Sequence, residues 1–198
     1  MKLLEKGTVY LIDDDDSMRK SLVGALKKLG YCVKDFYSPS IFLEETYHIT
    51  RPSVVLLDMQ MPEMSGIELQ EQLNKQGLLM PIIFISGQSH PEQIITGMKQ
   101  GAVDFLLKPF LLEELMRSID QVLESEVIQS NLYYHYSSLT PREKEIFIHL
   151  AKGKMNKEIA NELDISESMV KVHKSRVMEK MQATSVQALT TYYHLLKI

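Results

Sequence analysis

The chain has little cysteine and no long apolar run. Its single cysteine, Cys32, cannot form an intramolecular disulfide, which favours a reducing compartment. No apolar stretch approaches the ~18 residues that a membrane-spanning helix needs. The first seven residues, MKLLEKG, lack the apolar centre of a signal peptide. We therefore expect a cytoplasmic protein that does not bind a membrane.

Charge is unevenly distributed along the 198 residues. Residues 1–138 carry 12 basic and 19 acidic side chains, a formal charge of −7, whereas residues 139–198 carry 10 basic and 7 acidic side chains, a formal charge of +3. The apolar fraction of 44% and the charged fraction of 24% are those of an ordinary globular protein. A nucleic-acid partner therefore suits the second part of the chain and poorly suits the first.

The first ~125 residues alternate between short apolar runs and amphipathic segments of helical length, which predicts βα units around a parallel sheet. The predicted strands are 8–12, 31–36, 53–58, 82–86 and 103–107, and the predicted helices are 17–29, 39–47, 66–76, 91–100 and 112–130. Ser17 and Ser65 stand where helix N-caps are expected.

The strand pattern ends after residue 138. Four amphipathic helices are predicted at 141–152, 156–162, 167–181 and 184–196, and the second and third of these form a helix-turn-helix with Ser166 as an N-cap. We expect one domain over 1–127, a second over 139–198, and a linker over 128–138. Because the linker lacks a Gly or Pro run, we expect it to be helical or partly ordered.

Reactive side chains follow four of the predicted strands. The first strand leads into a run of four aspartates, 13–16, two others end at Asp58 and Ser86, and the last leads into Lys108. Ligands of open α/β sheets gather at the carboxyl ends of parallel strands. Crowded carboxylates repel one another in water, whereas a hard cation such as Mg²⁺ prefers oxygen ligands. The pattern thus predicts an acidic site with a hydroxyl and an amine at one rim of the sheet.

These motifs, in this order, resemble the receiver domain of two-component response regulators over roughly residues 7–127. The matching segments are Leu11-Ile12-Asp13-Asp14, Leu57-Asp58-Met59-Gln60-Met61-Pro62-Glu63-Met64-Ser65-Gly66, Ile85-Ser86-Gly87 and Asp104-Phe105-Leu106-Leu107-Lys108-Pro109-Phe110. The resemblance implies a doubly wound α/β fold with a five-stranded parallel sheet in the order 2-1-3-4-5.

The resemblance also implies a phosphoryl-transfer site. Asp58 would accept a phosphoryl group from a sensor histidine kinase, with Mg²⁺ as the cofactor. The implied metal ligands are Asp14 and Asp58 directly, Asp13 through water, and the backbone carbonyl of Gln60. Lys108 would neutralise one phosphoryl oxygen, the Ser86 hydroxyl would hydrogen-bond another, and Phe105 would be the switch aromatic. Asp15 and Asp16 are interpreted as charges at a helix N-terminus.

Residues 139 to about 196 resemble the LuxR-type helix-turn-helix domain of the NarL/FixJ class, which implies a small all-α DNA-binding domain. The matching segments are Leu139-Thr140-Pro141-Arg142-Glu143, Gly153, Asn156-Lys157-Glu158-Ile159-Ala160, Leu163-Asp164-Ile165-Ser166, Val170-Lys171-Val172-His173 and Lys180-Met181. Ser168-Met169 departs from the basic residue and threonine that are common in the family.

The helix predicted at 167–181 has an apolar face and a basic face. Val170, Val177 and Met181 are spaced to pack inward. We expect base-edge contacts from Lys171, Val172 and Ser175, and phosphate contacts from Lys174, Arg176 and Lys157. A basic face that is merely solvated is the alternative.

Both resemblances together indicate a transcription regulator that phosphorylation activates. They imply a sensor kinase, promoter DNA and RNA polymerase as partners, and a homodimer that forms on phosphorylation. The implied dimer face is helix 91–100 with strand 103–107, where Ile95 and Lys99 are exposed.

Two other classes of protein stay open. One is a Mg²⁺-dependent phosphohydrolase with Asp58 as nucleophile, for which Gln60 cannot serve as the acid. The other is a protein-interaction module.

Overall fold

The computed structural model describes residues 6–87, 91–196 and 198. The chain forms two compact units, residues 1–127 and 128–198. Among the described residues, no helix is both long and apolar enough to cross a membrane.

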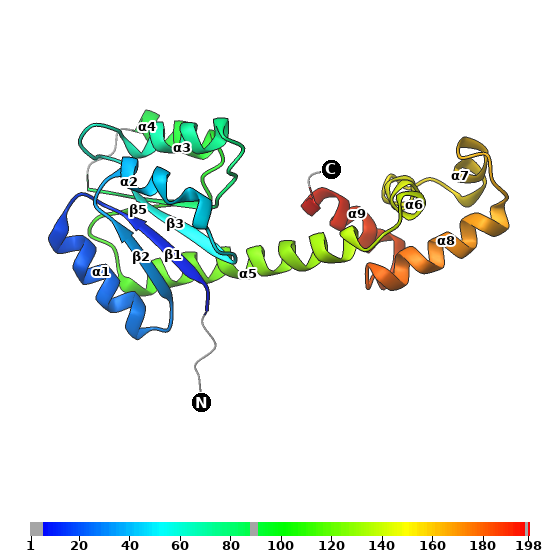
Figure 1. Ribbon diagram of the computed structural model, residues 1–198, viewed down its shortest axis with the longest axis horizontal. Helices are drawn as coiled ribbons and strands as arrows, with labels where there is room; N and C mark the ends of the chain where they lie inside the picture. Colours follow the sequence, from blue (N-terminus) through cyan, green and yellow to red (C-terminus); the bar gives the residue numbers. More distant parts are fainter. Residues whose placement is uncertain (1–5, 88–90, 197) are drawn as a thin grey trace. The chain divides into compact units, whose positions relative to one another are not determined.

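A five-stranded parallel sheet in the order β2-β1-β3-β4-β5 forms the centre of the first unit (Figure 1). The strands are β1 (Thr8–Ile12), β2 (Cys32–Phe36), β3 (Ser53–Asp58), β4 (Ile82–Ser86) and β5 (Asp104–Leu107). β1, β3 and β4 are buried along their whole length, as continuous apolar runs in a sheet covered on both faces should be. The predicted fold class and strand order are confirmed.

Helices cover both faces of this sheet. They are α1 (Asp16–Lys28), α2 (Pro39–Glu44), the 3₁₀ turn η1 (Thr46–His48), α3 (Gly66–Lys75), α4 (Pro91–Lys99) and α5 (Leu112–Ser137). In Figure 1, α1 and α5 lie on one face, and α2, α3 and α4 lie on the other. Each face has its own apolar core, one around Leu26 and Ile119 and the other around Phe42 and Leu69. This arrangement leaves the carboxyl ends of β1, β3, β4 and β5 together at one rim.

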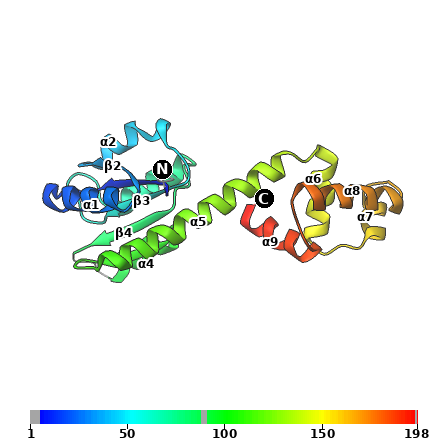
Figure 2. The same cartoon turned by 90° about the horizontal axis from the view of Figure 1, so that it is seen from below.

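Within the described residues of the second unit, α5 is followed by four helices: α6 (Pro141–Ala151), α7 (Asn156–Glu162), α8 (Glu167–Lys180) and α9 (Val186–Leu196). Figure 2 shows them from a second direction. Phe147, Val170 and Val177 are fully buried in their shared core. Thr140 and Glu143 form a capping box at the start of α6, and Ser166 caps α8 as predicted.

The N-cap predicted at Ser17 is wrong. The side chain of Asp15 caps α1 instead, because its carboxylate accepts the backbone N–H groups of Ser17 and Met18. Asp and Ser are equally good caps, so the run of aspartates supplies the cap two residues earlier. The N-cap predicted at Ser65 is confirmed, with Glu68 completing a capping box.

Two predicted helices differ from the structure by more than one or two residues at an end. The helix predicted at 39–47 breaks into α2 and η1. The helix predicted to end at residue 130 continues to Ser137, so most of the segment expected to link the domains is helical. Its last turns are held within the second unit: Leu132 is buried in the core, and the Tyr133 hydroxyl donates to the carbonyl of Leu196 at 2.8 Å.

Candidate functional site

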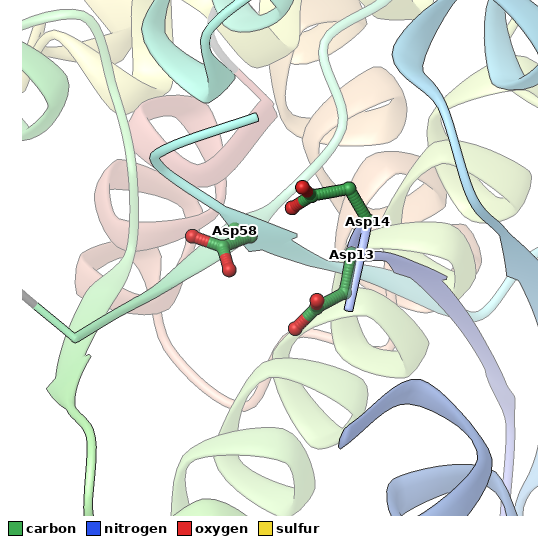
Figure 3. Close-up of side chains that lie close together, drawn as sticks. All are labelled: Asp13, Asp14 and Asp58. Carbon is green, nitrogen blue, oxygen red and sulfur yellow. The ribbon is translucent and has the colours of Figure 1, made fainter. Parts of the chain in front are cut away.

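Three carboxylates meet at the carboxyl ends of β1 and β3. These strands are neighbours, with Ile12 opposite Leu57, so the residues that follow them emerge side by side. One carboxylate oxygen from each of Asp13, Asp14 and Asp58 lies within 4.8 Å of the others (Figure 3). Asp13 is fully buried and Asp58 is 6% exposed, whereas Asp14 is open to solvent.

A lysine that directly follows β5 pairs with both buried acids. The Lys108 ammonium lies 2.6 Å from Oδ2 of Asp58 and 3.0 Å from Oδ2 of Asp13. Burial alone disfavours the ammonium, but hydrogen bonds to Asp58 and Asp13 outweigh it and hold the pKa of Lys108 above its ordinary value. Burial raises the pKa of Asp13, and the hydrogen bond and charge of Lys108 only partly oppose that effect.

Backbone groups orient both buried carboxylates. Oδ1 of Asp13 accepts the N–H of Asp15 at 2.8 Å, and Oδ1 of Asp58 accepts the N–H of Gln60 at 3.0 Å. Gly66, at the start of α3, packs directly on the backbone of Asp58 and Met59: a Cβ added to Gly66 would lie 2.4 Å from the carbonyl oxygen of Asp58. A side chain at this position would therefore push the acid-bearing strand end out of place.

The hydroxyl and the aromatic ring expected at the site lie on the neighbouring strands. Ser86 ends β4 and is fully buried, and its carbonyl accepts the N–H of Lys108 at 2.8 Å. Phe105 in β5 is half-buried and packs against the core that α2 and α3 cover. On α4, Ile95 is 53% exposed and Lys99 is also exposed.

This donor set fits a small hard cation. The three candidate ligands all offer carboxylate oxygens; two of these acids are buried, and the third is open to solvent. Mg²⁺ is typically bound by one or two carboxylates and keeps several water ligands, for which the exposed side of Asp14 leaves room. An ammonium group in the same pocket suits a second anion, such as a phosphoryl group.

The second unit carries a helix-turn-helix. α7 ends in a tight turn at Asp164, which has a φ of 51°, and the N–H of Ile165 returns to the carbonyl of Ala160 at 3.0 Å. On α8, Val170 and Val177 face the core as predicted. The side chains expected to contact DNA lie on the outer surface: Lys171, Val172, Ser175, Arg176 and Lys157 are exposed, and Lys174 is half-buried.

One residue beside the acidic site was missed in the sequence analysis. Arg19 is 7% exposed, and its guanidinium donates to the backbone carbonyl of Asp13 at 2.7 Å. A signal was present, since Arg19 shares one helical face with the core residues Leu22 and Leu26. A charged side chain on an apolar face needs a buried partner.

Both units match known protein families. Residues 9–120 match the response regulator receiver domain, and residues 137–193 match the bacterial regulatory proteins of the luxR family. The chain is 38% identical over 196 residues to the response regulator protein TodT of Pseudomonas putida, covering 96% of this chain and 86% of the relative.

Two further comparisons, one with a relative and one with a solved structure, also match a response regulator along nearly the whole chain. The transcriptional regulatory protein FixJ of Bradyrhizobium diazoefficiens is 36% identical over 191 residues, which cover 93% of each chain. The crystal structure of full-length FixJ from B. japonicum aligns with a TM-score of 0.58 and 34% identity, covering 98% of both chains.

The two matched domains are those of a regulator with a DNA-binding role and not of a metabolic enzyme. A receiver domain joined to a luxR-family domain implies a sensor kinase and DNA as partners. With a receiver of the observed strand order followed by a luxR-family domain, the chain belongs to the NarL/FixJ class of two-component response regulators, which are phosphorylation-dependent transcription regulators.

Proposed function

We propose that Asp58 is the residue that accepts the phosphoryl group. The observation that carries this proposal is the meeting of Asp13, Asp14 and Asp58 within 4.8 Å, with the Lys108 ammonium hydrogen-bonded to the two buried acids. Asp58 shares with Asp13 the contact with Lys108 and an orienting backbone N–H, and of the two it is Asp58 that stands on β3, the middle strand of the sheet. We take residues 1–127 as the receiver, 128–138 as the linker and 139–198 as the DNA-binding domain.

The acidic cluster would hold Mg²⁺. Asp14 and Asp58 would bind it directly, Asp13 through water, and Gln60 through its backbone carbonyl. When bound, Mg²⁺ would screen the negative charge between the nucleophile and the phosphoryl oxygens. Deprotonated carboxylates are required for this role; burial raises the pKa of Asp13, and the hydrogen bond and charge of Lys108 oppose that effect.

Transfer then needs little beyond positioning and charge. A carboxylate oxygen of Asp58 attacks phosphorus, the bond from phosphorus to the donor's imidazole nitrogen breaks, and the electron pair of that bond stays on the imidazole. Lys108 gives up one carboxylate partner and pairs with a phosphoryl oxygen. The Ser86 hydroxyl, on the adjacent strand end, donates a hydrogen bond to another phosphoryl oxygen.

The switch would couple this pocket to the α4–β5 surface. Ser86 ends β4, Lys108 directly follows β5, and Phe105 lies on β5, three residues before Lys108. A shift of the Phe105 ring would alter the surface on which Ile95 and Lys99 are exposed. We propose that phosphorylation shifts the equilibrium towards a homodimer through this surface.

The helix α8 would enter the major groove of promoter DNA. Exposed side chains along one side of the helix suit this role. We propose Lys171, Val172 and Ser175 for base edges, and Lys174, Arg176 and Lys157 for phosphates. We also propose that RNA polymerase is a further partner and that the protein is cytoplasmic.

The two alternative classes are weaker. The phosphohydrolase would need an acid near Asp58, and the residue two positions later, Gln60, cannot donate a proton as an acid. The match to a regulatory DNA-binding family over residues 137–193 favours DNA over a protein partner for the second unit.

The test is a mobility-shift titration with fragments of the chain's target promoter. The unaltered chain and Asp58→Asn are each incubated with Mg²⁺, with and without beryllofluoride as a phosphoryl mimic. We expect the mimic to tighten DNA binding by the unaltered chain and to leave Asp58→Asn unchanged. Asp15→Asn, an acid outside the cluster, is the matched control and should respond normally. An equal response of Asp58→Asn would refute the proposal.

A further inference from the structure

Arg19 is a buried cation next to the acidic pocket, yet no step of the proposed transfer uses it. Its side chain is 9% exposed, and it contacts three different segments of the chain. Nη1 donates to the carbonyl oxygen of Asp13 at 2.7 Å, Nη2 pairs with Asp16, and Nε lies 3.4 Å from Oδ2 of Asp35 on β2. Burying a guanidinium is unfavourable unless its donors find partners, and here each of its three nitrogens has an oxygen partner.

These contacts fix the backbone of Asp13 on both sides. Its N–H donates to the carbonyl of Phe36 at 3.2 Å, and its own carbonyl accepts from Arg19. Asp14 follows one peptide later, so its direction depends on the same peptide plane. The Asp13 carboxylate is held separately, by Lys108 and by the N–H of Asp15.

Arg19 also separates the four consecutive aspartates into two groups. Asp13 and Asp14 face Asp58, whereas Asp16 turns away to pair with Arg19 and with Lys20. Asp15 is occupied as the N-cap of α1. Without a cation on this side, repulsion among adjacent carboxylates would favour other arrangements of the loop.

We propose that Arg19 is a positioning residue that holds the peptide of Asp13 so that Asp13 and Asp14 present their carboxylates to a divalent cation. The inference rests on the proposed function, in which this cluster binds Mg²⁺. Arg19 acts through the ligands and does not itself contact the phosphoryl group. Outer residues that orient metal ligands typically change metal affinity by about 10- to 100-fold when replaced.

The test is calorimetric titration of the full chain with MgCl₂ alone, in the absence of any phosphoryl donor. We expect Arg19→Met to raise the Mg²⁺ dissociation constant by about 10-fold or more. Arg19→Lys keeps the charge but replaces three guanidinium nitrogens with a single ammonium nitrogen, and it should raise the dissociation constant less, by about 3-fold. Asp35→Asn is the matched control: it removes an outer partner of Arg19 but leaves the contact with Asp13, so the dissociation constant should change by less than about 2-fold.

A second readout separates positioning from loss of stability. The rate of phosphorylation by acetyl phosphate is measured as a function of Mg²⁺ concentration, at a temperature where circular dichroism shows each variant folded. We expect the Arg19 variants to need more Mg²⁺ but to approach the unaltered rate at saturation. Should Arg19→Met fail to fold, the same two measurements on Arg19→Lys decide.

The inference is overturned if both Arg19 variants bind Mg²⁺ as tightly as the unaltered chain, or if Asp35→Asn loses as much affinity as they do. Failure of the proposed function gives a different pattern, because the unaltered chain would then show no Mg²⁺ binding that depends on Asp58.

Discussion

Replacing Lys180 with methionine should destabilise the DNA-binding unit by about 2 kcal/mol. The Lys180 ammonium lies 2.6 Å from Oε2 of Glu143 and 3.2 Å from the carbonyl oxygen of Ser138. Glu143 is 2% exposed and also caps α6 through Thr140. Methionine preserves the length and the apolar stem of the side chain, so the substitution leaves a buried carboxylate without its cation.

The magnitude follows from the burial of the two partners. Removing one member of a fully buried ion pair costs about 3–5 kcal/mol. The Lys180 side chain is 35% exposed, so water can replace part of its ammonium. The N–H of Thr140 still donates to Glu143 at 2.9 Å in the variant. Both effects reduce the expected cost to about 2 kcal/mol.

The loss of stability caused by Lys180→Met should become smaller as pH falls. Burial raises the pKa of Glu143, but hydrogen bonds from Lys180 and Thr140 outweigh it, and the pKa lies below its ordinary value. The stabilisation is therefore present above the unfolded pKa of about 4.3 and is lost as pH falls through the lower folded pKa. The difference between Lys180→Met and the unaltered chain should be complete at neutral pH and shrink below about pH 4.

Hydrogen exchange of the α8 amides in the full chain measures the effect locally. A loss of about 2 kcal/mol should speed exchange about 30-fold at neutral pH. Urea unfolding followed by circular dichroism at neutral and acidic pH checks the pH dependence. Lys152→Met, at an exposed lysine after α6, is the control and should exchange at the unaltered rate. Equal exchange rates of the α8 amides in Lys180→Met and in the control would show that the ion pair does not stabilise the DNA-binding unit.

Further predictions concern DNA and dimerisation. Lys171→Ala should weaken operator binding by ~1–3 kcal/mol and blur the preference at one base pair of each half-site. Lys157→Ala should weaken binding to operator and to scrambled DNA equally and should flatten the salt dependence of binding. Both variants are compared by titrating the two duplexes at two salt concentrations. If Lys171→Ala loses the same affinity for both duplexes, Lys171 does not read a base. In sedimentation, Mg²⁺ with beryllofluoride should convert the chain from mostly monomer to dimer, and Ile95→Asp should prevent this. Identical mass distributions with and without the mimic would contradict the switch.

Much of the fold could be predicted because the buried strands are continuous apolar runs. Such runs occur where helices cover both faces of a sheet, and their order along the chain, together with the family resemblance, gave the strand order. The ends of helices were harder to predict. Asp15 and Ser17 are equally good caps, so only the course of the chain decides between them.

The candidate site could be predicted only in part. Asp13, Asp14, Asp58 and Lys108 were expected together because each stands at or just after the carboxyl end of a strand, and they do lie together at one rim. The shared helical face of Arg19, Leu22 and Leu26 indicated that Arg19 is buried but did not reveal its partner, because a backbone carbonyl leaves no mark in a residue pattern. The roles of the individual side chains stay predictions for solution experiments.

The most direct test of the central claim is to identify the phosphorylated residue chemically. The chain is phosphorylated with acetyl phosphate in the presence of Mg²⁺, the acyl phosphate is reduced with borohydride to homoserine, and the modified peptide is sequenced by mass spectrometry. We expect homoserine at position 58 and none when Mg²⁺ is chelated. Modification at Asp13, at Asp14 or at a residue outside the cluster, with position 58 unmodified, would contradict the account.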